Sequence, residues 1–217
     1  EQIEKRMRQI VQGKHEFKKT VLSADSHPRK AGINAILLEE GDGLIEAILT
    51  DGTQDIISGY REHISHFRSE PDNGTYDAMN KAIDIASGEW INFINAGDYY
   101  ASRTTLADIF SRPLDREIDF IYGDYIWKGE RNEIRIPARP LELMWQRISF
   151  SHQSLFARTT LMQQKKFDLR WKIVSDYNFY FSSYMEGRKF SRVDFPVSVF
   201  RAGGLSDVNF LLRTYER

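Results

Sequence analysis

Apolar and polar residues are grouped along the first half of the chain in blocks that predict strands and helices in turn. Short apolar runs predict strands, and blocks with apolar residues three and four positions apart predict helices. The predicted strands are residues 17–23, 44–49, 64–68 and 90–94, and the predicted helices are residues 28–40, 54–60 and 76–86. Strands that alternate with helices build a sheet with helices on both faces. We therefore expect an α/β fold with a mostly parallel central sheet.

In the second half of the chain, the predicted strands and helices no longer alternate regularly. Its pattern predicts a strand over residues 119–122 that ends at Gly123-Asp124, and a hairpin over 124–137. It further predicts helices over 104–110, 140–147 and 174–185, strands over 154–157 and 190–200, and a helical tail from residue 207. The hairpin indicates a small antiparallel region beside the main sheet.

The first residues form a separate unit in this pattern. Residues 1–12 carry apolar side chains at helical spacing with charges between them, which predicts an amphipathic helix. We expect its apolar stripe to pack on its own domain rather than on a partner. The predicted organisation is an N-terminal helical extension over residues 1–16 and a single domain over 17–217.

Composition excludes several classes of protein. The 217 residues carry a net charge of −1, which gives no electrostatic basis for binding nucleic acid. The chain contains no cysteine, so disulfides and cysteine-bound zinc are excluded, and a cytoplasmic location is expected. No apolar run approaches the roughly 20 residues that span a bilayer.

Acidic residues follow the predicted strands at four places. These are Asp25, Asp51, Asp98 and Asp124. Each of these residues taken alone can be explained structurally, as a turn or helix-cap residue. In a parallel sheet, however, all four would meet at one rim, and clustered carboxylates repel one another unless a cation compensates. A divalent ion, Mg²⁺ or Mn²⁺, is the natural partner of such a set.

One segment carries a strong resemblance to a known family. Residues 69–81 read SEPDNGTYDAMNK, and residues 88–98 read GEWINFINAGD. Together with Tyr122-Gly123-Asp124, HQSLF at 152–156, Ser175-Asp176-Tyr177 and GGLS at 203–206, this order resembles bacterial family 2 glycosyltransferases with the GT-A fold. The resemblance covers residues 17–210 and is closest to colanic-acid-type enzymes of exopolysaccharide and O-antigen synthesis. It implies a nucleotide-binding half over residues 17–100 and an acceptor-side half over 119–210.

The resemblance implies an inverting transfer of a sugar from a nucleotide diphosphate, UDP in our expectation, to an acceptor hydroxyl. Asp98 matches the family's metal-binding position for Mn²⁺ or Mg²⁺, and Asp176 matches its general base. The residues implied in binding the nucleotide-sugar donor are Asp25, Asp51, Gly74, Tyr76, Asp77, Asn80, Lys81, Asn95, His152 and Arg201. Three departures from the family are an altered first strand end, a shortened loop after Asp51, and Asn95 in place of an acidic residue.

Structural explanations stand beside these roles. Asp77 and Asp176 suit the first turn of a helix without any ligand, and His152 is as often a structural residue. Trp145 and Trp171 could stack on sugars, although packing in the core is the favoured interpretation. A sugar-nucleotide pyrophosphorylase is disfavoured because no Gly-rich loop follows residues 17–23. The three departures leave open a catalytically degenerate module that binds a sugar or a partner.

The resemblance implies the chemical class of the acceptor but not its identity. We expect a glycan or a lipid-linked oligosaccharide of bacterial surface polysaccharide synthesis. A lipid-linked acceptor would bring the protein to the inner face of the cytoplasmic membrane. Basic residues on the N-terminal helix, Lys5, Arg6 and Arg8, could support such a peripheral contact.

Overall fold

The computed structural model describes most of the chain from residue 72 onward. Residues 72–202 are described apart from 96, 97 and 112, together with residues 58–59 and the backbone of four earlier strands. The predicted helices over 1–12 and in the tail from 207, most of the helix over 54–60, and Asp51 lie outside the described residues. No helix within the described ranges is long and apolar enough to cross a membrane.

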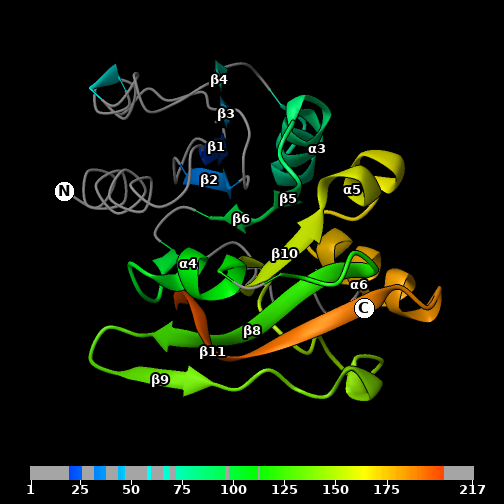
Figure 1. Cartoon of the computed structure of the whole chain (residues 1–217). Coiled ribbons are helices and arrows are strands. Elements are labelled where there is room, and N and C mark those ends of the chain that lie inside the picture. The colour runs from blue at the N-terminus through cyan, green and yellow to red at the C-terminus, as the bar shows by residue number, and fades with distance from the viewer. Residues whose placement is uncertain are drawn as a thin grey trace.

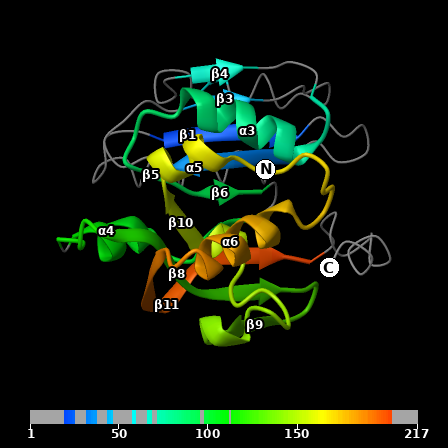
Figure 2. The ribbon, with the colours of Figure 1, turned by 90° about the vertical axis from the view of Figure 1, so that its right-hand side faces the viewer.

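The described strands form three sheets. The first is β1 (Thr20–Asp25), β2 (Gly32–Leu37) and β6 (Phe93–Ile94), and a second, two-stranded sheet pairs β3 (Leu44–Glu46) with β4 (His66–Arg68). The largest runs in the order β5 (Trp90–Ile91), β10 (Leu155–Arg158), β8 (Ile118–Lys128), β11 (Lys189–Arg201) and β7 (Tyr99–Tyr100), with β9 (Glu133–Ile136) paired to β8. Figure 1 and Figure 2 both show β1 to β4 at the top, β8, β9 and β11 at the bottom, and β10 between them.

The described part of the chain also contains six helical elements with defined bounds. These are α3 (Thr75–Ile85), α4 (Thr105–Phe110), α5 (Thr159–Lys165) and α6 (Ser175–Met185), with the 3₁₀ turns η2 (Leu141–Leu143) and η3 (His152–Ser154) completing the helical set. Helices and strands therefore mix along the chain, and the α/β class is confirmed. α5 was not predicted from the sequence pattern.

The sheets are mixed rather than mostly parallel. Among the strand pairings that the structure describes, β3 with β4 and β8 with β11 are parallel, and the others are antiparallel. The predicted helix over 28–40 is wrong, since β2 lies there and pairs antiparallel with β1. The segment GINAIL is a short apolar run with two β-branched residues, and period alone does not separate helix from strand in such a run.

Strand β8 is longer than predicted. It continues through Gly123 and Asp124 to Lys128, so Gly123-Asp124 is not a turn. A Cβ at Gly123 would lie 2.7 Å from a methyl group of Val193 and 2.8 Å from one of Val197, both on β11. Gly123 is required here because two strands approach each other closely. The predicted hairpin is confirmed, since β9 pairs antiparallel with β8.

Strand β8 lies between two apolar layers. Phe120 and Tyr122 pack in one cluster with Phe179 and Tyr180 of α6. Ile121, whose side chain points to the opposite face, packs with α4 in a second cluster that also contains Trp90. The sheet is thus covered on both faces, as the sequence predicted for the central sheet.

Two further predictions need correction. The predicted helix over 140–147 is reduced to the single 3₁₀ turn η2. Trp145, which we expected to pack in the core, is 66% exposed beside the buried Met144. The apolar contacts of this segment with the core are made by Leu141, Met144 and Ile148.

Candidate active site

Asp176 lies in the first turn of α6, where the sequence placed it, and it is held by three groups. Its Oδ1 accepts hydrogen bonds from the Tyr76 hydroxyl and from the Tyr177 backbone N–H, each at 2.8 Å. Its Oδ2 lies 3.0 Å from Nδ1 of His152. The Asp176 side chain is 15% exposed, so the carboxylate is held by its partners and still accessible.

These contacts decide the ionisation of Asp176. Burial raises its pKa, but the hydrogen bond from His152, with those from Tyr76 and the Tyr177 N–H, outweighs burial, and the net pKa is lowered from the ordinary value. Burial first, and then the neighbouring Asp176 charge, raise the pKa of Tyr76 well above its ordinary value. Tyr76 therefore keeps its proton and remains a donor, while Asp176 is ionised at neutral pH.

His152 connects Asp176 to the end of β6. Its Nε2 lies 2.8 Å from Nδ2 of Asn95, the residue that follows β6. With the amide in this orientation, Asn95 donates to Nε2, so the imidazole proton lies on Nδ1 and is donated to Asp176. The Oδ1 of Asn95 is buried without a hydrogen-bond partner. An orphaned amide oxygen beside a carboxylate and an imidazole is a binding group for a ligand hydroxyl or cation.

Asp98 lies on the other side of the same 3₁₀ turn, η3. Gln153, next to His152 in the sequence, donates from Nε2 to Asp98 Oδ2 at 2.6 Å. The backbone N–H of Arg201 donates to Asp98 Oδ1 at 2.8 Å, and Asp98 N–H donates to the Asn95 carbonyl at 3.0 Å. Asp98 and Asp176, distant in the sequence, are thus contacted by two consecutive residues of η3, Gln153 and His152.

The oxygen atoms of Asp98 and Asn95 are the candidate ligands for a divalent ion. Asp98 is 3% exposed, and its two oxygens accept hydrogen bonds from Gln153 and from the Arg201 N–H. Carboxylate and amide oxygens, here Asp98 and Oδ1 of Asn95, are the hard ligands that Mg²⁺ and Mn²⁺ take. Among the described residues no three acidic, histidine or cysteine side chains form a metal-binding group. Asp98 and Asn95 thus offer ligand atoms of the kind that such an ion takes, without a complete set of protein ligands in the described part of the chain.

The start of α3 carries four of the predicted donor-binding residues. Gly74 precedes the helix with φ of 113°, a conformation that requires glycine. Asp77 accepts from the Asn73 N–H at 2.9 Å and pairs with Lys81 at 3.4 Å, one turn along the helix. This Asn73 hydrogen bond is the largest cause of the lowered pKa of Asp77. The hydrogen bond from Asn73 and the pairing with Lys81 thus keep Asp77 at the helix terminus, whereas Tyr76 reaches across to Asp176.

Asn80 lies outside the Asp176 network. Its Nδ2 donates to the Phe167 carbonyl and its Oδ1 accepts from the Phe167 N–H, both at 2.8 Å. The side chain is buried, and this reciprocal pair ties α3 to the segment before α6. Its hydrogen-bonding groups face a backbone rather than the space beside Asp176.

For the remaining residues predicted to bind the nucleotide-sugar donor, the structure gives the position of the backbone. Asp25 ends β1, which runs in the same direction as β6 with β2 between them, so Asp25 and Asn95 lie at the same edge of that sheet. Arg201 ends β11, and its N–H contacts Asp98. Asp51 lies outside the described residues.

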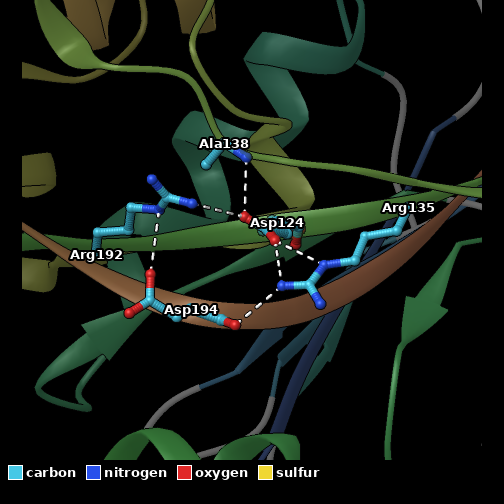
Figure 3. Close-up of polar contacts among 6 residues, drawn as sticks. Asp124, Arg135, Ala138, Arg192 and Asp194 are labelled. Atoms are coloured by element: carbon cyan, nitrogen blue, oxygen red, sulfur yellow. Dashed lines mark hydrogen bonds and ion pairs between the residues drawn. The ribbon is translucent and has the colours of Figure 1, made fainter.

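Asp124 does not join Asp98 and belongs to an ionic cluster of its own (Figure 3). Its side chain is 2% exposed, and its oxygens contact Arg135 at 2.6 Å and Arg192 at 3.4 Å. It also accepts from the Ala138 N–H at 2.9 Å. The rim therefore loses one of its four expected carboxylates, because β8 extends past Asp124 and turns it toward the β9 strand.

Two residues of the site were missed by the sequence reasoning. Gln153 and Asn92 are fully buried polar residues beside Asp98 and η3. Gln153 stands inside the HQSLF motif, which was its available signal. Asn92 interrupts an otherwise apolar strand, and a buried asparagine there has to find partners.

The fold has a close counterpart among solved structures. It is similar to a mannosyltransferase from Pyrobaculum calidifontis in complex with GDP-Man and Mn²⁺, with a TM-score of 0.58. The identity is 15%, and the match covers 81% of this chain and 52% of that chain. At this identity the likeness establishes the GT-A fold.

Curated relatives come from mycobacteria. The chain is 29% identical over 141 residues to a "PGL/p-HBAD biosynthesis glycosyltransferase" of Mycobacterium bovis (strain BCG / Pasteur 1173P2), covering 63% of this chain and 55% of the relative. It is 30% identical over 91 residues to an "Uncharacterized glycosyltransferase" of Mycobacterium tuberculosis (strain CDC 1551 / Oshkosh), covering 42% of this chain and 32% of the relative. The chain thus spans about half the length, or less, of these relatives.

The family description "Glycosyl transferase family 2" matches residues 47–182, which is more than half of the chain and contains Asp98, His152 and Asp176. On this match, the chain belongs to glycosyl transferase family 2.

Proposed function

We propose that the protein is a glycosyltransferase that moves a sugar from a nucleotide diphosphate to an acceptor hydroxyl with inversion at the anomeric carbon. The observation that carries this proposal is that Tyr76 and His152 hold an ionised Asp176. Gln153, the residue next to His152, holds Asp98. Membership of family 2 and the GT-A fold support the same activity. The degenerate scaffold is not favoured, because both acidic residues are kept in place by buried partners.

Asp176 serves as the general base. As the acceptor oxygen forms its bond to the anomeric carbon, the bond from that carbon to the diphosphate breaks on the opposite face. The bonding electron pair leaves with the nucleoside diphosphate, and the hydroxyl proton passes to Asp176. A carboxylate with a lowered pKa is a weak base at rest, but the attacking oxygen becomes acidic as its bond forms.

His152 and Tyr76 orient the carboxylate in this step. Tyr76 and the Tyr177 N–H both donate to Oδ1 of Asp176 and His152 contacts Oδ2, so Oδ2 is the oxygen that would receive an acceptor hydroxyl. Holding a base in a fixed direction lowers the cost of reaching the reactive geometry. Donation from both residues also keeps Asp176 ionised between turnovers.

Asp98 and Asn95 would hold a divalent ion, Mn²⁺ or Mg²⁺, together with the donor diphosphate. When bound, such an ion neutralises the charge that develops on the departing diphosphate. The solved mannosyltransferase was obtained with GDP-Man and Mn²⁺, which supports a metal and makes GDP the first alternative to UDP as the nucleotide. Asp25 and Arg201 lie at the edges of the same region through their backbone positions.

The acceptor is proposed as a glycan or lipid-linked oligosaccharide of a bacterial surface polysaccharide, used in the cytoplasm at the inner face of the membrane. A mycobacterial relative named for PGL/p-HBAD biosynthesis supports a role in building a glycan. Peripheral contact with the membrane through the N-terminal residues is part of this proposal.

The substitution Asp176→Asn tests the function. It keeps the shape of the side chain but removes the base, so transfer should fall by about 10² to 10⁴ while nucleotide binding is kept. Transfer is measured as nucleoside diphosphate released from UDP- and GDP-sugars in the presence of octyl and p-nitrophenyl hexosides as acceptors.

Asp108 provides the matched control. It is also an aspartate in the first turn of a helix, α4, but its carboxylate accepts a hydrogen bond from the exposed Thr104 hydroxyl at the surface. Asp108→Asn should leave transfer unchanged. Wild-type transfer by Asp176→Asn would remove Asp176 from the base role.

A further inference from the structure

The turn η3 contacts five separate parts of the protein through three consecutive side chains. His152 contacts Asp176 on α6 and Asn95 after β6. Gln153 contacts Asp98, which precedes β7. Ser154 lies 2.7 Å from the Ser198 hydroxyl on β11 and donates to the Asp124 carbonyl on β8 at 3.0 Å. The position of Asp98 relative to Asp176 is therefore set by this turn.

The amide of Gln153 has a single orientation that satisfies its neighbours. An ionised Asp98 can only accept, so the Gln153 group that faces it at 2.6 Å must be the NH₂. The Oε1 on the other side accepts a hydrogen bond from the Ser151 hydroxyl. Because the side chain is fully buried, no solvent molecule competes for these contacts. Gln153 therefore fixes one oxygen of Asp98 in direction as well as in distance.

Asn92 anchors the backbone of the same turn. Its Nδ2 donates to the Gln153 carbonyl at 3.1 Å and to the Leu155 carbonyl at 2.7 Å. Its Oδ1 accepts from the Tyr100 hydroxyl at 2.9 Å. Tyr100 follows Asp98 by two residues, so the polar chain returns to the segment that carries the carboxylate. Both ends of the Gln153–Asp98 contact are thus tied to one buried amide.

We propose that Gln153 is a positioning residue that aims the Asp98 carboxylate at the diphosphate and its divalent ion. The proposal rests on the proposed function and adds to it a residue that touches neither donor nor acceptor. Groups that hydrogen-bond to a metal ligand set its direction, and their removal weakens metal affinity about 10- to 100-fold. Gln153 should act through Asp98 alone.

Binding of UDP and GDP with and without Mn²⁺, measured by titration calorimetry, tests the proposal. In Gln153→Met, which removes the amide but keeps the length, the gain in nucleotide affinity on adding Mn²⁺ should fall at least about tenfold. Affinity without Mn²⁺ should stay at the wild-type value. Combined with Asp98→Asn, the Gln153→Met change should cause no further loss, because both act on one contact.

Two further variants keep the test decisive. Ser151→Ala leaves Gln153 in place but removes the hydroxyl that fixes its amide, and should cost about fivefold in the Mn²⁺-dependent gain. This variant decides the matter if Gln153→Met does not fold. Gln163→Met is the control, since Gln163 also donates from its amide to carbonyls, those of Ile83 and Ala86, away from Asp98.

The outcomes separate this inference from the function itself. A wild-type Mn²⁺ dependence in Gln153→Met, or in Ser151→Ala where Gln153→Met fails to fold, with the dependence lost in Asp98→Asn, would overturn the positioning role and leave the proposed function standing. A wild-type protein that binds neither nucleotide under either condition would reject the donor part of the proposed function.

Discussion

Replacing Asp124 by asparagine should destabilise the fold by removing one charge from a buried cluster. The carboxylate accepts from the Ala138 N–H and from Nε of Arg135 at 2.8 Å, and it also contacts Nη2 of Arg135 and of Arg192. An asparagine that keeps its oxygen on the Ala138 N–H points its NH₂ at the Arg135 guanidinium. Two donors would then face each other where one carboxylate now accepts from both arginines (Figure 3).

The size of the effect follows from the burial of each partner. Breaking a buried ion pair from one side costs about 3–5 kcal/mol. The side chains of Arg135 and Arg192 are 53% and 40% exposed, so both can be rehydrated after the change. We therefore expect the lower end, about 3 kcal/mol, which for a chain of this length lowers Tm by about 6–12 °C.

Urea denaturation and thermal melting followed by circular dichroism measure this effect. Asp194→Asn is the matched control, because Asp194 contacts Arg192 at 3.6 Å in the same cluster while its side chain is 92% exposed. The control should change the free energy of unfolding by less than about 0.5 kcal/mol. Equal stabilities of Asp124→Asn and Asp194→Asn would refute the assignment of Asp124 to a buried ionic role.

Three more changes give separate tests. Asn80→Ala leaves the Phe167 N–H and carbonyl unpaired and should cost about 2–4 kcal/mol in urea unfolding with nucleotide affinity kept; weakened binding at unchanged stability would instead place Asn80 in the donor site. Gly74→Ala forces a side chain into a glycine conformation and should cost about 1–3 kcal/mol, seen as a lower Tm; an unchanged Tm contradicts it. The folded pKa of Asp176 is lowered, so its contribution to stability is present above the ordinary carboxyl value of about 4 and is lost as pH falls through the folded pKa. The difference in unfolding free energy between wild type and Asp176→Asn should therefore shrink in acid, and a difference independent of pH would count against the His152 contact.

The elements with a long, clear pattern were predictable from the sequence. α3, α6 and β11 lie within one residue or so of the predicted bounds, because each shows a period or a run longer than five residues. β2 was predicted as a helix because its short apolar run fits either structure. β8 was ended too early because Gly123 signals both a turn and a close approach of strands, and only the packing of β11 distinguishes the two.

Sequence reasoning pointed to Asp98 and Asp176 but not to the residues that hold them in place. Asp98 and Asp176 were found from motif order, and the structure brings them to the two sides of η3. Their buried partners Gln153 and Asn92 carry no local pattern, since a polar residue in an apolar segment does not reveal which group it will meet. Asp124 was grouped with the others by sequence position alone, and the length of β8 removes it from the set.

The parallel pairing of β8 with β11 has a consequence for how quickly the protein acquires its site. The two strands are separated by the segment that contains η2, η3, β10, α5 and α6, so their register forms only after a long loop has closed. Until then β8 exposes an unpaired edge, and Ser154 lacks its partner on β11. On the ribosome, the base and the diphosphate-side carboxylate should therefore reach their final separation late, when residues 189–201 have emerged, which exposes nascent chains to aggregation before that point.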